Sequence, residues 1–148
     1  CSYLRSRKIF AEHDASSNGN PDIKVLWKNN AWLGEAKIAR SNTDSMEGWK
    51  QLVDRYSTGE PNNCYGGLLL YFPQPNVLEK IESWKAFLSD RAKLSSVKDC
   101  CKRPKVSFLT EIEHPVSQSP YIVRHMPVML YFEPTDKSAR SSKKHKAS

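Results

Sequence analysis

Residues 20–38 decide the fold of this chain, and they read N-P-D-I-K-V-L-W-K-N-N-A-W-L-G-E-A-K-I. Two strand-like runs, residues 22–28 and 31–39, lie on either side of Asn29 and Asn30. Asparagine tolerates the positive φ angles that a two-residue turn requires. The stretch therefore predicts a β-hairpin with these two asparagines at its turn.

A hairpin with this turn has two unlike faces, because side chains alternate along each strand and opposed residues share a face. Asp22 then faces Lys37 and lies diagonal to Glu35. The first face carries Asp22, Lys24, Leu26, Leu33, Glu35 and Lys37. The second face carries Ile23, Val25, Trp27, Trp32, Gly34, Ala36 and Ile38. We expect the second face to pack against the core, with Trp27 and Trp32 as a cross-strand pair.

The first face brings two carboxylates and an ammonium group together. Diagonal residues of a ladder have Cα atoms ~7–8 Å apart, so the carboxylates of Asp22 and Glu35 can converge on one cation. Mg²⁺ suits two carboxylates whose remaining partners are water and phosphate. Lys37 is placed to orient a water molecule or to stabilise charge on a phosphate. The alternative is a set of ordinary solvated residues, with Glu35 and Lys24 in a surface ion pair worth under ~1 kcal/mol.

Three helices are expected outside the hairpin. The first covers residues 2–13. The second is amphipathic, because apolar residues recur at helical spacing at Trp49, Leu52, Val53 and Tyr56. The third begins at a capping box formed by Asn76 and Glu79. Its apolar stripe consists of Val77, Ile81, Trp84 and Leu88.

Three further strands are expected. Residues 66–72 are apolar almost throughout, which is typical of a strand covered on both faces. Residues 106–113 and 121–133 also have strand character, and Pro127 in the second of these indicates an edge strand or a bend. Helices and strands interleave, so the sequence predicts an α/β fold with a central mixed sheet flanked by helices.

Length and charge divide the 148 residues into one domain and a tail. Residues 137–148 hold five of the 23 basic residues and no acidic one, so we expect a disordered basic tail after a domain of residues 1–136. The longest apolar run, residues 68–72, is far shorter than a membrane span needs, so no membrane partner is expected. Four cysteines without framework spacing suit a reducing, intracellular compartment, cytoplasmic or nuclear. Because the chain begins at Cys1, we expect a fragment of a larger protein.

The motif N-P-D-I at residues 20–23, followed by E-A-K at residues 35–37 on the next strand, resembles the PD-(D/E)xK nuclease superfamily, which has the restriction-endonuclease-like fold. The next helix carries Gln51, and the strand at residues 66–72 follows it, as in the core order of that superfamily. Tyr56 lies one position later than in the Q-x-x-x-Y form of this helix.

The resemblance implies a role for each matching residue. Asp22 and Glu35 would be ligands of Mg²⁺ or Mn²⁺, with the Ala36 carbonyl as a third ligand. Lys37 would be the catalytic lysine, and Gln51 would support the attacking water or the scissile phosphate.

The resemblance also implies two features before the motif. An acidic residue on the first helix often joins the site, and Glu12 is the candidate here. A strand is expected between that helix and the motif aspartate, but residues 14–21 leave no room for one.

The leading hypothesis is a Mg²⁺- or Mn²⁺-dependent nuclease domain that hydrolyses phosphodiester bonds, with DNA as the expected substrate. Two alternatives stay open: a catalytically silent nucleic-acid-binding or assembly module of the same fold, and an RNA endonuclease. One metal site cuts one strand, so cutting both strands would need a homodimer or two successive nicks. Sequence recognition would need further domains of a parent protein.

Overall fold

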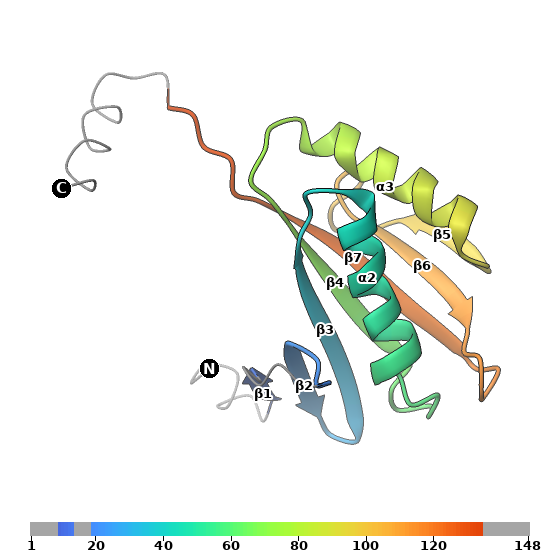
Figure 1. Cartoon of the computed structure of the whole chain (residues 1–148). Helices are drawn as coiled ribbons and strands as arrows, with labels where there is room; N and C mark the ends of the chain where they lie inside the picture. The colour runs from blue at the N-terminus through green and yellow to red at the C-terminus, as the bar shows by residue number, and fades with distance from the viewer. Residues whose placement is uncertain (1–8, 14–18, 135–148) are drawn as a thin grey trace.

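A seven-stranded mixed sheet forms the centre of the computed structural model, which describes residues 9–13 and 19–134 (Figure 1). The strands lie in the order β1-β2-β3-β4-β7-β6-β5. Their bounds are β1 Ile9–His13, β2 Ile23–Trp27, β3 Asn30–Ile38, β4 Tyr65–Phe72, β5 Ser96–Asp99, β6 Phe108–Glu113 and β7 Pro120–Met129. The central strands β3, β4 and β7 are parallel, and the outer pairs are antiparallel. The predicted α/β class with a central mixed sheet is confirmed.

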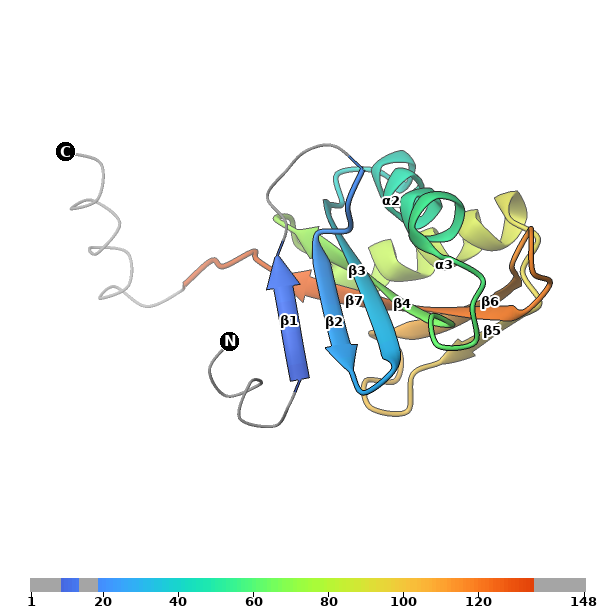
Figure 2. The same cartoon turned by 90° about the horizontal axis from the view of Figure 1, so that it is seen from below.

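Both α-helices lie on the same face of this sheet (Figures 1 and 2). Helix α2 (Asn42–Lys50) continues directly into a π-helix, η1 (Gln51–Tyr56), and α3 (Val77–Arg91) follows β4. The apolar stripes predicted for these helices are confirmed, since every member is buried: Trp49, Leu52, Val53, Tyr56, Val77, Ile81, Trp84 and Leu88. They pack on inward-facing residues of the sheet such as Leu68, Leu70 and Val123.

The face of the hairpin predicted to meet the core is the wrong one. Leu33 is buried beneath the helices, whereas Trp27 and Ile38 on the other face are each 49% exposed. The register explains this, because Glu35 pairs with Leu68, so the buried apolar row of β4 lies on the carboxylate side of the sheet. Within the described ranges, no helix covers the opposite face. Trp27 and Trp32 are not a cross-strand pair either: their partners are Asn30 and Val25.

The predicted first helix is also wrong where the structure describes it. Residues 9–13 form β1, which pairs antiparallel with β2. Hydrogen bonding to a neighbouring strand overrides the local helical pattern, whose apolar members in residues 2–13 were Tyr3, Leu4, Ile9 and Phe10. β1 ends at His13, before residues 14–21, in which the sequence leaves no room for a strand. The rest of the predicted helix, the loop at 14–18 and the tail at 137–148 lie outside the described residues.

Two smaller expectations need correction, and one strand was missed. Asn76 precedes α3 with φ 61°, and its side chain makes no capping bond, because a left-handed residue lacks the extended backbone of a capping box. Pro127 is buried in β7, an interior strand rather than an edge. It is tolerated there because β6 pairs with β7 only as far as Phe108 opposite His125, two residues short of Pro127. β5 was not predicted.

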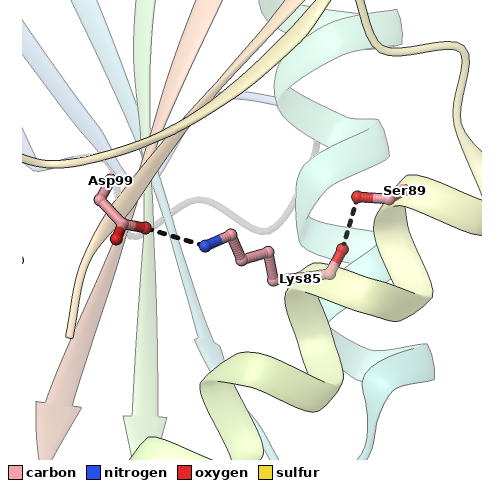
Figure 3. Close-up of polar contacts among 3 residues, drawn as sticks. All are labelled: Lys85, Ser89 and Asp99. Atoms are coloured by element: carbon pink, nitrogen blue, oxygen red, sulfur yellow. Dashed lines mark hydrogen bonds and ion pairs between the residues drawn. The ribbon is translucent and has the colours of Figure 1, made fainter. Parts of the chain in front are cut away.

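Two polar contacts fasten α3 to the sheet. Trp84 Nε1 donates to His125 Nδ1 at 3.1 Å, in the interior. Lys85 Nζ reaches Asp99 Oδ1 at 2.8 Å, and Ser89 Oγ donates to the Lys85 carbonyl (Figure 3). The helices are therefore held at fixed heights above β3 and β4, where the candidate site lies.

Candidate functional site

The hairpin β2–β3 turns one residue earlier than predicted. Trp27 pairs with Asn30, so the turn consists of Lys28 and Asn29, and Lys28 takes the positive φ of 53°. The strands are therefore shifted by two residues relative to the expected pairing. A shift of two keeps every side chain on its face, because the side-chain period of a strand is two. Extending the register by one residue sets Asp22 opposite Glu35 instead of diagonal to it.

The structure brings Asp22, Glu35 and Ala36 together. Asp22 Oδ2 accepts a hydrogen bond from the Ala36 backbone N–H at 2.8 Å. Glu35 is only 3% exposed, and its Oε2 atom is buried without a hydrogen-bond partner. A buried carboxylate oxygen with nothing to bind is costly, since burial removes its water without replacement. Glu35 Oε2 therefore lacks the hydrogen-bond donor or cation that would compensate for its burial.

Lys37 joins the same cluster. Its Nζ lies 3.0 Å from Glu35 Oε1, so one oxygen of Glu35 is paired and the other is free. The alternative prediction was a surface ion pair between Glu35 and Lys24. Glu35 pairs instead with Lys37, on the same strand β3. Gly48 of α2 makes room for it, because a Cβ there would come within 2.6 Å of Lys37 Cγ. Sequence reasoning missed Gly48, although a glycine inside a helix signals a close packing partner.

Burial and neighbouring charges raise the pKa values of two residues at this cluster, Glu35 and Tyr56. Burial is the largest cause that raises the pKa of Glu35 above its ordinary value, and the Asp22 carboxylate raises it further. The hydrogen bond and charge of Lys37 offset this only in part. Burial and the charge of Glu35 also raise the pKa of Tyr56, so the hydroxyl of that residue lies within the electrostatic reach of the cluster.

The residues fit the divalent cation that the sequence predicts. The free Oε2 of Glu35 and the carboxylate of Asp22 are hard oxygen donors, and Ala36, whose carbonyl was the expected third ligand, is fixed between them by its own N–H. Burial and, to a smaller extent, the Asp22 charge raise the pKa of Glu35, and a cation there would offset that charge. The described part of the chain holds no group of three or more His, Cys, Asp or Glu side chains able to bind a metal, a threshold that two carboxylates and a carbonyl do not reach.

Gln51 makes no bond to this cluster within the described residues, although η1 packs against β3. It begins η1, its Oε1 is buried without a hydrogen-bond partner, and it lines a shallow hollow with Lys50 and Arg55. No hydrogen bond or ion pair of the described residues links it to Asp22 or Glu35.

The π-helix bears on the spacing of Gln51 and Tyr56. A π-helix closes its turns with i→i+5 bonds, of which the bond from Ser57 N to Leu52 O (3.0 Å) is one. Residues five apart are then one turn apart. In an α-helix they would be ~1.4 turns apart, on different sides. The extra residue noted between Gln51 and Tyr56 is thus absorbed by the helix type, a feature that sequence reasoning did not anticipate.

A hollow of about 510 Å³ lies at the next residue pair of the hairpin, Lys24 and Leu33, and Asp22, Glu35 and Lys37 do not line it. Lys24, Leu33, Arg55, Tyr56 and Asn63 are among the residues that line it. Arg55 lines this hollow, and Arg40 lines a separate hollow at the far ends of β3 and β4.

Three further polar residues are either held by contacts within the fold or have side chains outside the described residues. Glu12 pairs through its backbone with Lys24, but its side chain is outside the described residues. His125 is fully buried, which lowers its pKa to about 3, and its Nε2 lies 3.0 Å from Thr110 Oγ1. His114 bonds the backbone of its own turn, as expected of a strand-end histidine.

Comparison with known proteins adds no neighbour to this picture. No protein-family model, curated protein or solved structure matches the chain. None of the described helices has the length and apolar character needed to cross a bilayer.

Proposed function

We propose that this chain is a divalent-metal-dependent nuclease domain of the PD-(D/E)xK type that hydrolyses phosphodiester bonds in nucleic acid, with DNA as the substrate. One observation carries the proposal: a fully buried carboxylate, Glu35, has one oxygen bound to Lys37 and the other without a partner, next to Asp22. Buried side-chain oxygens usually have a hydrogen-bond partner, and a bound ion is one explanation for an oxygen that lacks one.

The order of elements supports the same proposal. Three antiparallel strands, β1 to β3, are followed by a helix and then by β4, which is parallel to β3. This order matches the core that the resemblance implies, including the strand before the motif aspartate. The restriction-endonuclease-like assignment remains part of the proposal.

Each residue would have a defined task. Asp22, Glu35 and the Ala36 carbonyl would hold Mg²⁺ or Mn²⁺, which neutralises phosphate charge and lowers the pKa of a bound water. The Lys37 ammonium, 27% exposed, can orient the attacking water and stabilise charge that develops on the phosphate. Gln51, whose buried oxygen lacks a partner, can accept a hydrogen bond from that water.

The test is cleavage of plasmid DNA, single-stranded DNA and RNA in Mg²⁺, Mn²⁺ or EDTA. We expect cutting that requires metal and is lost in Lys37→Ala. The matched control is Lys93→Ala, an exposed lysine after α3. Activity that persists in EDTA or in Lys37→Ala contradicts the proposal. Salt-sensitive binding without any cutting would support the silent binding module instead, and cutting of RNA alone would support the RNA endonuclease.

A further inference from the structure

The side of the sheet that faces away from the helices is rich in apolar side chains. Because side chains alternate along a strand, the neighbours of buried residues such as Leu68 and Val123 point away from the helices. We call this side of the sheet the open face; its members include Trp27, Trp32, Ile38, Tyr65, Leu69 and Met126. Trp27 and Ile38 are each 49% exposed, and Tyr65 is 54% exposed. Parallel strands such as β3, β4 and β7 are usually covered on both faces, so within the described residues the open face lacks its cover (Figure 2).

The open face is flat at its centre. Gly34 and Gly67 pair directly across β3 and β4. The indole of Trp32 occupies the space above both, since a Cβ built on Gly34 would lie 2.8 Å from Trp32 Cζ3 and one built on Gly67 would also meet the ring. The indole therefore lies along the sheet instead of standing out from it. A flat apolar surface of this kind fits another sheet, because two sheets pack face to face with their strands within about 30° of each other.

The charges of the open face favour a second copy of the chain over a polyanion. On β5, β6 and β7, two basic residues, Lys98 and Arg124, share this face with two acidic residues, Glu111 and Glu113, so the charges cancel. The described strands β2, β3 and β4 add no charged side chain to it. Affinity for nucleic acid comes largely from lysines and arginines that neutralise phosphates, and here they are not in excess. A face without net charge can meet an identical face without the cost of opposing like charges.

The size of the open face also matches what a dimer requires. Seven strands ~4.8 Å apart span about 29 Å, and a strand length of ~20 Å gives a projected area of roughly 600 Å². Side chains add relief to this plane, so the accessible area approaches the ~800 Å² that each partner contributes to a standard interface. Tryptophan and tyrosine are enriched among the residues that carry the binding energy of interfaces, and Trp27, Trp32 and Tyr65 belong to this face. A second copy supplies a sheet with the same twist, the same apolar centre and no net charge.

We propose that two copies of this chain form a two-fold dimer in which the open faces pack against each other as a sandwich of two sheets. A two-fold axis brings the same patch of both partners together, so the patch must be compatible with itself. Glu35 and Lys37 lie on the helix side of each sheet, so the dimer leaves both candidate sites uncovered. The inference does not depend on the proposed nuclease function.

The experiment measures the mass of the full chain in EDTA by sedimentation equilibrium, from about 1 to 100 µM, a range that brackets dimers of moderate affinity. Trp27→Lys and Ile38→Lys each place a charge on the open face. Leu78→Lys is the matched control, because Leu78 is an equally exposed apolar residue (52%) on α3. Circular dichroism establishes that each variant is folded. Fluorescence anisotropy with a short DNA strand tests the polyanion as the alternative occupant.

We expect the wild type and Leu78→Lys to reach twice the mass of the chain. Each variant of the open face should weaken the dimer by about 10-fold or more, the effect of losing one well-packed interface residue. A wild type that stays monomeric over the whole range, or a dimer that both folded variants retain, overturns the inference. Growth beyond two copies contradicts the two-fold arrangement. A monomer that binds the DNA strand, and loses this binding in Trp27→Lys and Ile38→Lys, assigns the face to nucleic acid and also overturns it.

Discussion

Replacing Glu35 by Gln should change stability in opposite directions with and without metal. In EDTA, the wild type buries a charged oxygen that has no partner, which costs about 1–3 kcal/mol. The ion pair with the partly exposed Lys37 returns under ~1 kcal/mol. The amide NH2 of a glutamine can donate to the neighbouring Asp22 carboxylate, so Glu35→Gln should be roughly 1–2 kcal/mol more stable, which raises the melting temperature by about 2–8 °C for a chain of this size.

Divalent metal should reverse the order. At a concentration about 100 times its Kd, a ligand that binds only the folded state adds ~2.7 kcal/mol. For the wild type this corresponds to a rise of roughly 5–11 °C in the melting temperature, and for Glu35→Gln we expect almost none. Thermal melts followed by circular dichroism in EDTA, Mg²⁺ and Mn²⁺ give both numbers, with the exposed Glu47→Gln on α2 as the control. The reasoning is refuted if the variant melts below the wild type in EDTA, or if it keeps the metal-induced rise.

Three further outcomes follow from the same geometry. Because the pKa of Glu35 is raised in the folded state, the native protein binds more protons at this residue, which lowers metal-free stability as pH rises from about 4.5 towards the raised value; denaturant titrations should show this contribution as a difference in slope between wild type and Glu35→Gln. Gly48→Ala should push Lys37 out of place and lower the cleavage rate, by about 100-fold for a displacement of ~1 Å, and an unchanged rate in plasmid assays would contradict this. Thr110→Val should leave the ring N–H of His125 buried without an acceptor and cost about 1–3 kcal/mol in urea unfolding, whereas Thr110→Ser should lose less.

The candidate cluster could be predicted from sequence because the face on which a side chain lies depends only on whether the strand pairing shifts by an even or an odd number of residues. The expected turn at Asn29 and Asn30 was wrong by one residue, and the pairing by two. A shift of two leaves Asp22, Glu35 and Lys37 on one face, so the error changed a diagonal contact into a direct one without dispersing the residues. A shift of one would have placed Asp22 on the opposite face of the sheet from Glu35 and Lys37.

The predictions that were wrong concern features decided by contacts between residues distant in sequence. The burial of the carboxylate face depends on the register of β3 with β4, more than 30 residues along the chain, which places Glu35 beside Leu68. Hydrophobicity of the hairpin alone indicated the other face, since Trp27 and Ile38 are more apolar than the residues that are buried. The helical pattern near β1 failed for the same reason, because pairing with β2 outweighs local propensity.

The helix after the hairpin shows that the same residue spacing places two side chains differently in an α-helix and in a π-helix. With α-helical geometry throughout, the residue added between Gln51 and Tyr56 would turn the tyrosine ~100° away from the glutamine's side of the helix. η1 instead closes with i→i+5 bonds, so Tyr56 stays one turn from Gln51 while also filling its place in the buried stripe. Single π turns inside α-helices are found frequently at functional sites. The departure from Q-x-x-x-Y is therefore compatible with the proposed site, because η1 keeps Tyr56 on the side of the helix that carries Gln51.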